Sequence, residues 1–133
     1  GKYWGAEHIY HHTAPINLYY GLREALRLIA EEGLAACWQR HQTNVEYLWQ
    51  QLAELGLSLH VEKEFRLPTL TTVCIPDGVD GKAIARQLLT EHNIEIGGGL
   101  GELAGKVWRV GLMGYNSKPE SCDRLIAALK QVM

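Results

Sequence analysis

Hydrophobic residues recur at helical spacing over the first half of the chain and predict two helices. The first follows Thr13 and Pro15, which suit the N-cap and the first turn of a helix, and it ends at Gly33. The second begins immediately afterwards and ends at Gly56. Each helix carries one apolar stripe of the kind that packs against a neighbouring element. The stripes consist of Leu18, Leu22, Ala25, Leu26 and Ile29, and of Leu34, Trp38, His41, Val45, Leu48, Leu52 and Leu55.

The hydrophobic period then shortens to two, which predicts strands. Apolar and polar residues alternate over 57–61, and β-branched residues are frequent over 70–75. The glycine run at 97–101 precedes a third alternation, which we interpret as another strand. The apolar face of this last strand consists of Trp108, Val110 and Leu112.

Two further helices are predicted between and after these strands. Asp80 suits the N-cap of one, and Ser117 with Glu120 has the form of a capping box for the other. Two helices, followed by strands interleaved with helices, predict an α+β fold in which helices cover a small, mostly antiparallel sheet. The apolar positions of the later helices are Ile84, Ala85, Leu88 and Leu89, then Cys122, Leu125, Ile126 and Leu129.

Composition limits the classes of protein to consider. A chain of 133 residues suits one domain, and its 47% hydrophobic and 21% charged residues are typical of a globular protein. The formal net charge of −2 argues against nucleic acid or an anionic membrane as a partner. Cys37, Cys74 and Cys122 match no metal or disulfide spacing, so we predict reduced thiols and a cytoplasmic location. No apolar run in the sequence approaches membrane-spanning length.

The candidate chemistry centres on Arg109. Strand alternation places this side chain opposite the apolar face, beside Gly111, which has no side chain to block it. A guanidinium group can hold a carboxylate with two parallel hydrogen bonds. Gly97 and Gly98 in the preceding loop would allow positive φ and the close approach of a ligand. The alternative interpretation of Arg109 is an ordinary salt bridge on the surface.

A second candidate anion site lies at the start of the first predicted helix. Helix N-termini present unpaired N–H groups and the positive end of the dipole, so they attract phosphate. The hydroxyl groups of Tyr10 and Thr13 would add donors there, although Thr13 could simply cap the helix and Tyr10 could simply pack. A zinc site from His8, His11 and His12 is disfavoured because no cysteine or carboxylate ligand stands at a familiar spacing, so no metal is predicted.

Four segments, taken in order, resemble one known family. They are residues 10–15 (Tyr-His-His-Thr-Ala-Pro), 67–69 (Leu-Pro-Thr), 94–101 (Ile-Glu-Ile followed by the glycine run) and 105–111 (Gly-Lys-Val-Trp-Arg-Val-Gly). The chain is similar over nearly all of its length to the C-terminal part of alanine–glyoxylate and serine–pyruvate aminotransferases. These are class V enzymes of the fold-type I group, which depend on pyridoxal phosphate. The resemblance implies the fold of the aminotransferase small domain.

The resemblance also implies a role for each candidate residue. Arg109 matches the arginine that binds the α-carboxylate of the amino acid or 2-oxo acid, and Gly97 and Gly98 match a loop running close to that site. Tyr10 and Thr13 match positions whose hydroxyl groups contact the cofactor phosphate of the neighbouring subunit, which implies pyridoxal 5'-phosphate and a homodimer. The full enzyme would move an amino group from alanine or serine to glyoxylate or another 2-oxo acid.

In this family the lysine that holds the cofactor lies in a preceding large domain. The resemblance therefore implies that residues 1–12 enter from that missing domain and that residues 13–133 form the C-terminal small domain with its leading helix. No catalytic residue is expected in this chain, which would be inactive alone because the lysine is absent. The alternative is a stand-alone binding or dimerisation module that has the fold without complete catalytic machinery.

Overall fold

The computed structural model describes residues 12–133. Tyr10, His8 and His11 lie outside the described residues, so the roles considered for them stay predictions. The chain divides into two compact units, residues 1–37 and residues 38–133. The predicted domain boundary between residues 12 and 13 stays a prediction.

The first predicted helix is confirmed as α1 (Ile16–Glu32), but its N-cap differs from the prediction. Pro15 occupies the cap position, and its carbonyl oxygen accepts hydrogen bonds from the N–H groups of residues 18 and 19. Thr13 as the N-cap is therefore wrong, because the helix begins two residues later than its position requires. The helix ends at Gly33, whose φ of 83° is in the left-handed region that glycine tolerates.

The second predicted helix is α2 (Leu34–Glu54), and only part of its apolar stripe is buried. Val45, Leu48 and Leu52 are completely buried in the core. Leu34 and Trp38, in contrast, are 53% and 65% exposed. The predicted packing is thus confirmed from His41 to Leu52, while Leu34 and Trp38 at the start of the stripe are exposed.

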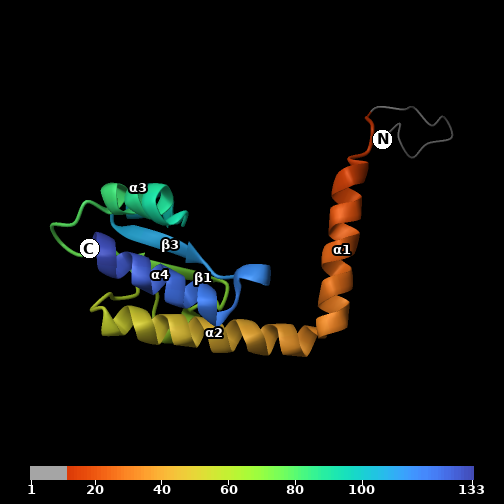
Figure 1. Ribbon diagram of the computed structural model, residues 1–133, viewed down its shortest axis with the longest axis horizontal. Coiled ribbons are helices and arrows are strands. Elements are labelled where there is room, and N and C mark those ends of the chain that lie inside the picture. Colours follow the sequence, from red (N-terminus) through yellow and green to blue (C-terminus); the bar gives the residue numbers. More distant parts are fainter. Residues whose placement is uncertain (1–11) are drawn as a thin grey trace. The chain divides into compact units, whose positions relative to one another are not determined.

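A three-stranded antiparallel sheet forms the centre of the second unit (Figure 1). Its strands are β1 (Leu70–Cys74), β2 (Gly97–Gly98) and β3 (Val107–Gly111), arranged in the order β1-β3-β2. Arg109 on the central strand pairs with Thr72 on one side and with Gly97 on the other. Together with the helices, this sheet confirms the predicted α+β fold.

The predicted strand over residues 57–61 is reduced to a single bridge. Leu59 pairs with Val73, and the N–H group of His60 donates to the carbonyl oxygen of Thr72. The chain then leaves the edge of the sheet for a short 3-10 turn at Lys63–Phe65, and the Nε of Arg66 donates to the carbonyl oxygen of Val61. The strand prediction is therefore wrong in length, because this turn removes the backbone from further pairing.

The core joins α2, α3 (Gly81–His92) and α4 (Pro119–Val132) to one face of the sheet. The predicted N-cap of α3 is confirmed, because Asp80 accepts hydrogen bonds from the N–H groups of Lys82 and Ala83. In the view of Figure 1, α4 lies across the strands, with α3 on one side of it and α2 on the other. Buried residues that fill this core include Val45, Leu48, Leu52, Val73, Ile84, Leu88, Trp108, Val110, Leu112, Leu125, Ile126 and Leu129.

The predicted capping box at the start of α4 is wrong. Lys118 is the N-cap residue and makes no side-chain capping bond, while Ser117 is only 1% exposed. The carbonyl oxygen of Ser117 accepts hydrogen bonds from Asn44 Nδ2 at 2.8 Å and from Arg40 Nη1 at 2.8 Å. Ser117 thus fastens the start of α4 to α2, and this role draws it away from the cap.

Burial controls the chemistry of Cys122. This thiol is 1% exposed, and desolvation raises its pKa to about 11, with a smaller contribution from the neighbouring charge of Asp123. We expect Cys122 to resist iodoacetamide at pH 8 in the native protein, because the thiolate is the reactive species. Mass spectrometry after unfolding in guanidinium should show ready alkylation of the same residue. Rapid native labelling would contradict the buried position.

No disulfide joins the three cysteines, all of which lie within the described residues. Within residues 12–133, the helices are too short or too polar to cross a membrane. The predicted cytoplasmic location stays a prediction.

Candidate functional site

The two faces of the sheet differ, and Arg109 lies on the face away from the helices. Trp108, Val110 and Leu112 point into the helical core, as the alternation predicts. Arg109 and Gly111 share the other face, where Gly111 is exposed and Arg109 is partly buried. The sheet therefore presents a guanidinium group on a surface that the helices leave uncovered.

The glycines of β2 receive the Arg109 side chain. The Nε of Arg109 donates a hydrogen bond of 2.7 Å to the carbonyl oxygen of Gly98. A Cβ atom added at Gly97 would lie 3.2 Å from Nη2 of Arg109, tighter than most real Cβ contacts. Gly97 thus lets the guanidinium lie close against the neighbouring strand.

The expectation of positive φ is wrong for Gly97 and Gly98. In this hairpin the positive φ values fall at Gly101 (54°) and Gly105 (75°), in the turn between β2 and β3. Gly97 leaves room for the guanidinium group because it has no side chain, and Gly98 accepts the hydrogen bond of Arg109 with its carbonyl oxygen. The glycine run is needed here for space more than for backbone conformation.

The electrostatic surroundings of Arg109 favour an anion. No carboxylate of residues 12–133 forms an ion pair with it, so the surface salt bridge considered as an alternative is not found there. Because Nε is engaged by Gly98, the two Nη atoms are the donors that remain for a ligand. Two Nη groups of one guanidinium match the two oxygens of a carboxylate.

Gly99 fixes the turn beside this site. Its N–H group donates to the carbonyl oxygen of Val107 at 2.9 Å, which extends the pairing beyond β2. A Cβ atom at Gly99 would lie 1.9 Å from the carbonyl oxygen of Leu103. At Gly98, in contrast, an added Cβ would meet nothing within 4 Å. The backbone next to Arg109 is therefore closely packed at Gly99 and open at Gly98.

The start of α1 is the position where the sequence predicts a phosphate site. Its cap position is held by Pro15, which makes no side-chain capping bond to the first turn, and Thr13 is exposed just before it. The positive end of the helix dipole is therefore next to the Thr13 hydroxyl. His12 belongs to no group of three candidate metal ligands among residues 12–133. The predicted absence of a metal site stays a prediction, because His8 and His11 lie outside that range.

Sequence reasoning missed Thr72 beside Arg109 and Met113 beside Gly111 on the same strand. Thr72 pairs directly with Arg109, and the methyl group of Met113 lies 3.5 Å from the position that a Cβ at Gly111 would take. Alternation along residues 70–75 could have placed Thr72 on the polar face. Nothing in the sequence indicates that Met113 folds back over the strand.

Comparison with known proteins identifies the class. The family described as Aminotransferase class-V matches residues 2–124. Since this match covers most of the sequence, the chain belongs to the class-V aminotransferase family.

Individual relatives agree with this assignment. Alanine–glyoxylate aminotransferase from Mus musculus is 44% identical over 136 residues, which cover 99% of this chain and 33% of the relative. A crystal structure of alanine–glyoxylate aminotransferase from Nostoc sp. has 82% identity and a TM-score of 0.90, covering 98% of this chain and 35% of that one. The structure of pyridoxamine–pyruvate aminotransferase from Mesorhizobium loti has 30% identity and a TM-score of 0.87, covering 99% and 34%. The chain thus spans about a third of the length of these relatives.

Proposed function

We propose that this chain is the C-terminal part of a pyridoxal-phosphate-dependent aminotransferase. The full-length protein would transfer an amino group from alanine or serine to glyoxylate or another 2-oxo acid. The names of the relatives support this class of reaction. The observation that carries the proposal is Arg109, whose guanidinium lies against Gly97 and Gly98 without an ion pair from residues 12–133.

Arg109 would bind and orient the substrate carboxylate. With Nε fixed on Gly98, its Nη1 and Nη2 groups would grip the two carboxylate oxygens end-on. Holding the carboxylate in one orientation also fixes the direction of the bonds at the neighbouring carbon atom. Gly97 and Gly98 would serve this subsite by admitting the side chain and by accepting its hydrogen bond.

The start of α1 fits the phosphate of pyridoxal 5'-phosphate. Thr13, together with Tyr10, would donate hydroxyl hydrogen bonds to that phosphate beside the N-terminus of α1. When bound, the cofactor supplies an electron sink for the carbanion formed at the substrate α-carbon. By the resemblance, the phosphate would belong to the neighbouring subunit of a homodimer.

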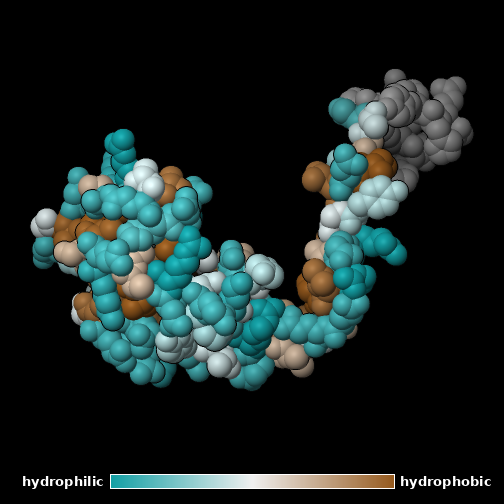
Figure 2. Space-filling view, viewed as in Figure 1, coloured by the Kyte–Doolittle hydropathy of each residue, from teal (hydrophilic) through white to brown (hydrophobic). Residues whose placement is uncertain are grey.

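The exposed apolar stripe of α1 supports the proposal that another part of the complete protein covers this helix. None of the residues of α1 is buried. Even the apolar Leu18 and Leu22 are 71% and 57% exposed. Figure 2 shows hydrophobic surface along α1. Such surface is unusual on a free monomer. We therefore propose that a preceding large domain, a second subunit, or both cover α1 in the complete protein.

One pair of measurements tests the proposed function. The full-length protein, loaded with pyridoxal phosphate, should form alanine-derived pyruvate when it is given alanine and glyoxylate. The 133-residue chain alone should show no cofactor absorbance that responds to an amino acid, because the resemblance implies that the cofactor-binding lysine belongs to the preceding large domain. A full-length protein without transamination would refute the proposal, and a responsive isolated chain would refute the expected inactivity.

A further inference from the structure

Three side chains of α2, those of Arg40, His41 and Asn44, hold the turn that follows the strand of Arg109. This turn comprises residues 113–117. The N–H group of Gly114 donates to Nε2 of His41 at 2.9 Å. The Nη1 of Arg40 donates to the carbonyl oxygens of Gly114 at 2.9 Å and Ser117 at 2.8 Å. Backbone donors and acceptors of the 113–117 turn are thus satisfied by α2, more than 70 residues away in sequence.

The contact with Gly114 defines the state of the His41 ring. This side chain is only 8% exposed, and its Nε2 accepts a hydrogen bond from a backbone N–H group. A nitrogen can accept only when it carries no proton, so the structure assigns a neutral ring with its proton on Nδ1. Any form with a proton on Nε2 would set two donors against each other in a buried place.

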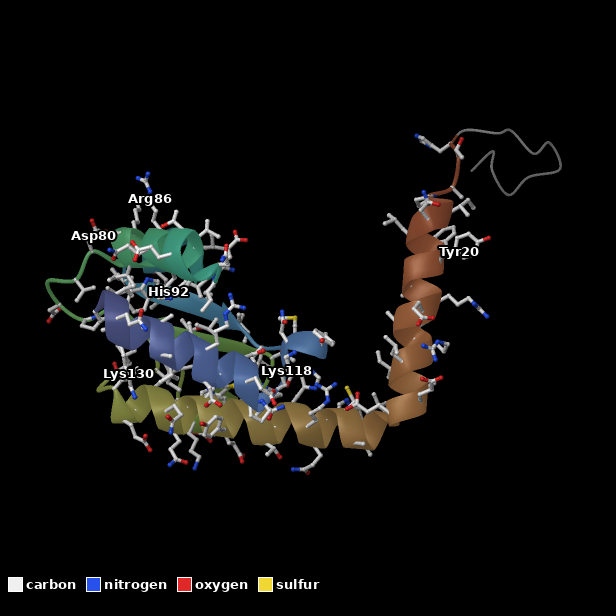
Figure 3. The ribbon with its side chains drawn as sticks, in the orientation of Figure 1. Tyr20, Asp80, Arg86, His92, Lys118 and Lys130 are labelled. Carbon is white, nitrogen blue, oxygen red and sulfur yellow. The ribbon has the colours of Figure 1, made fainter. Side chains whose placement is uncertain are left out.

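Residues 113–116 of the turn are exposed, and Ser117 at its end is buried. Tyr115 is 87% exposed, and its ring contacts the ammonium group of Lys118 at 4.2 Å. Figure 3 labels Lys118 where α4 begins. Segments with few buried apolar contacts open locally at low cost. The hydrogen bonds from Arg40, His41 and Asn44 therefore fasten this exposed turn to α2.

The position of the turn matters at Arg109 because of Met113. The Met113 methyl group reaches back to the Gly111 backbone, within 3.5 Å of the place of a Cβ there. Gly111 is two residues after Arg109, on the same face of β3. Fixing Gly114 therefore fixes the adjacent Met113 over the surface on which Arg109 lies.

We propose that His41 is a positioning residue for substrate binding. Through the Gly114 N–H group it keeps Met113 against the Arg109 face, and it thereby sets the width of the subsite that receives the substrate carboxylate. This inference rests on the proposed function, because it requires that Arg109 binds that carboxylate.

Two substitutions in the full-length protein test the inference. His41→Ala should raise KM for glyoxylate by about five- to tenfold, the size of one lost hydrogen bond, with kcat within about twofold. His41→Gln should restore most of the affinity, because its Oε1 can accept the Gly114 hydrogen bond. Gln42→Ala is the matched control, since Gln42 is the next residue on α2 and donates to Glu46 of the same helix.

Hydrogen exchange of the Gly114 amide separates this role from general destabilisation. The amide should be protected in the wild type and in His41→Gln, and it should exchange faster in His41→Ala while core amides of β3 stay unchanged. If His41→Ala does not fold, the tautomer of His41 in the wild-type protein tests the inference instead. A proton on Nε2 of His41 would overturn the inference.

The outcomes distinguish the two proposals. An active wild type with an unchanged KM in folded His41→Ala would overturn the role of His41 alone. A wild-type protein without transamination would overturn the proposed function and this inference together. A raised KM that His41→Gln restores, together with faster Gly114 exchange in His41→Ala, supports the positioning role.

Discussion

Arg109→Ala in the full-length protein should lower kcat/KM for glyoxylate by about ten- to more than a hundredfold. The estimate follows from the loss of one charge-assisted contact, worth about 1.5–3 kcal/mol in total, at about 1.4 kcal/mol per factor of ten. The structure adds a geometric reason for a large effect. Among residues 12–133 no other cation is placed against the open backbone of Gly97 and Gly98 in the same way.

The matched control for this substitution is Arg86→Ala. Arg86 is an exposed arginine of α3, and it points outward from that helix in Figure 3. Both variants remove one positive charge, so a loss of steering by overall charge would affect them equally. Steady-state kinetics with alanine and glyoxylate should show the large loss only for Arg109→Ala. Equal losses in the two variants would argue against a specific carboxylate site.

The second large effect is expected on stability, from Gly99→Ala. The new methyl group would lie 1.9 Å from the carbonyl oxygen of Leu103, so one segment of backbone has to move. We expect a loss of about 3 kcal/mol or more in the free energy of opening of β3, near the upper end for overpacking. Amide hydrogen exchange of β3, measured at increasing guanidinium concentrations, reports this free energy.

Gly98→Ala is the control for that measurement. Its added methyl group would meet nothing within 4 Å, and its backbone has no positive φ. The two substitutions are chemically identical and adjacent in sequence, so they differ only in local space. Similar exchange of β3 in both variants would show that the turn around residues 99–106 is looser than the structure indicates.

The sequence was informative wherever a pattern depends on neighbours along the chain. Periodicity located α1, α2, α3 and α4, and alternation correctly separated the buried face of β3 from the face that carries Arg109. The N-cap Asp80 was also predictable, because a capping bond reaches only two or three residues ahead.

Predictions failed where a distant segment competes for the same groups. Ser117 has the residue type of an N-cap, but Arg40 and Asn44 bind its carbonyl oxygen from α2. The strand over residues 57–61 keeps its alternation yet pairs at only one position, because the following turn withdraws the backbone. The contacts of Ser117 span more than 70 residues and leave no local signature.

In the candidate site, too, the features set by neighbouring residues were predictable and those set by distant contacts were not. The strand pattern is sufficient to place Arg109 on an uncovered face. The strand register that pairs Arg109 with Gly97 cannot be predicted from that pattern. The neighbours Thr72 and Met113 likewise emerge only from pairing and from the course of the 113–117 turn. The substrate and cofactor roles of Arg109, Gly97, Gly98, Thr13 and Tyr10 stay predictions.

A crystal structure of the full-length protein with a bound 2-oxo acid would test the central claim most directly. We predict that Nη1 and Nη2 of Arg109 each lie about 2.7–2.9 Å from one carboxylate oxygen, with Nε still bonded to Gly98. A carboxylate held by other residues, with Arg109 paired to an acidic side chain of the remaining polypeptide, would contradict the account.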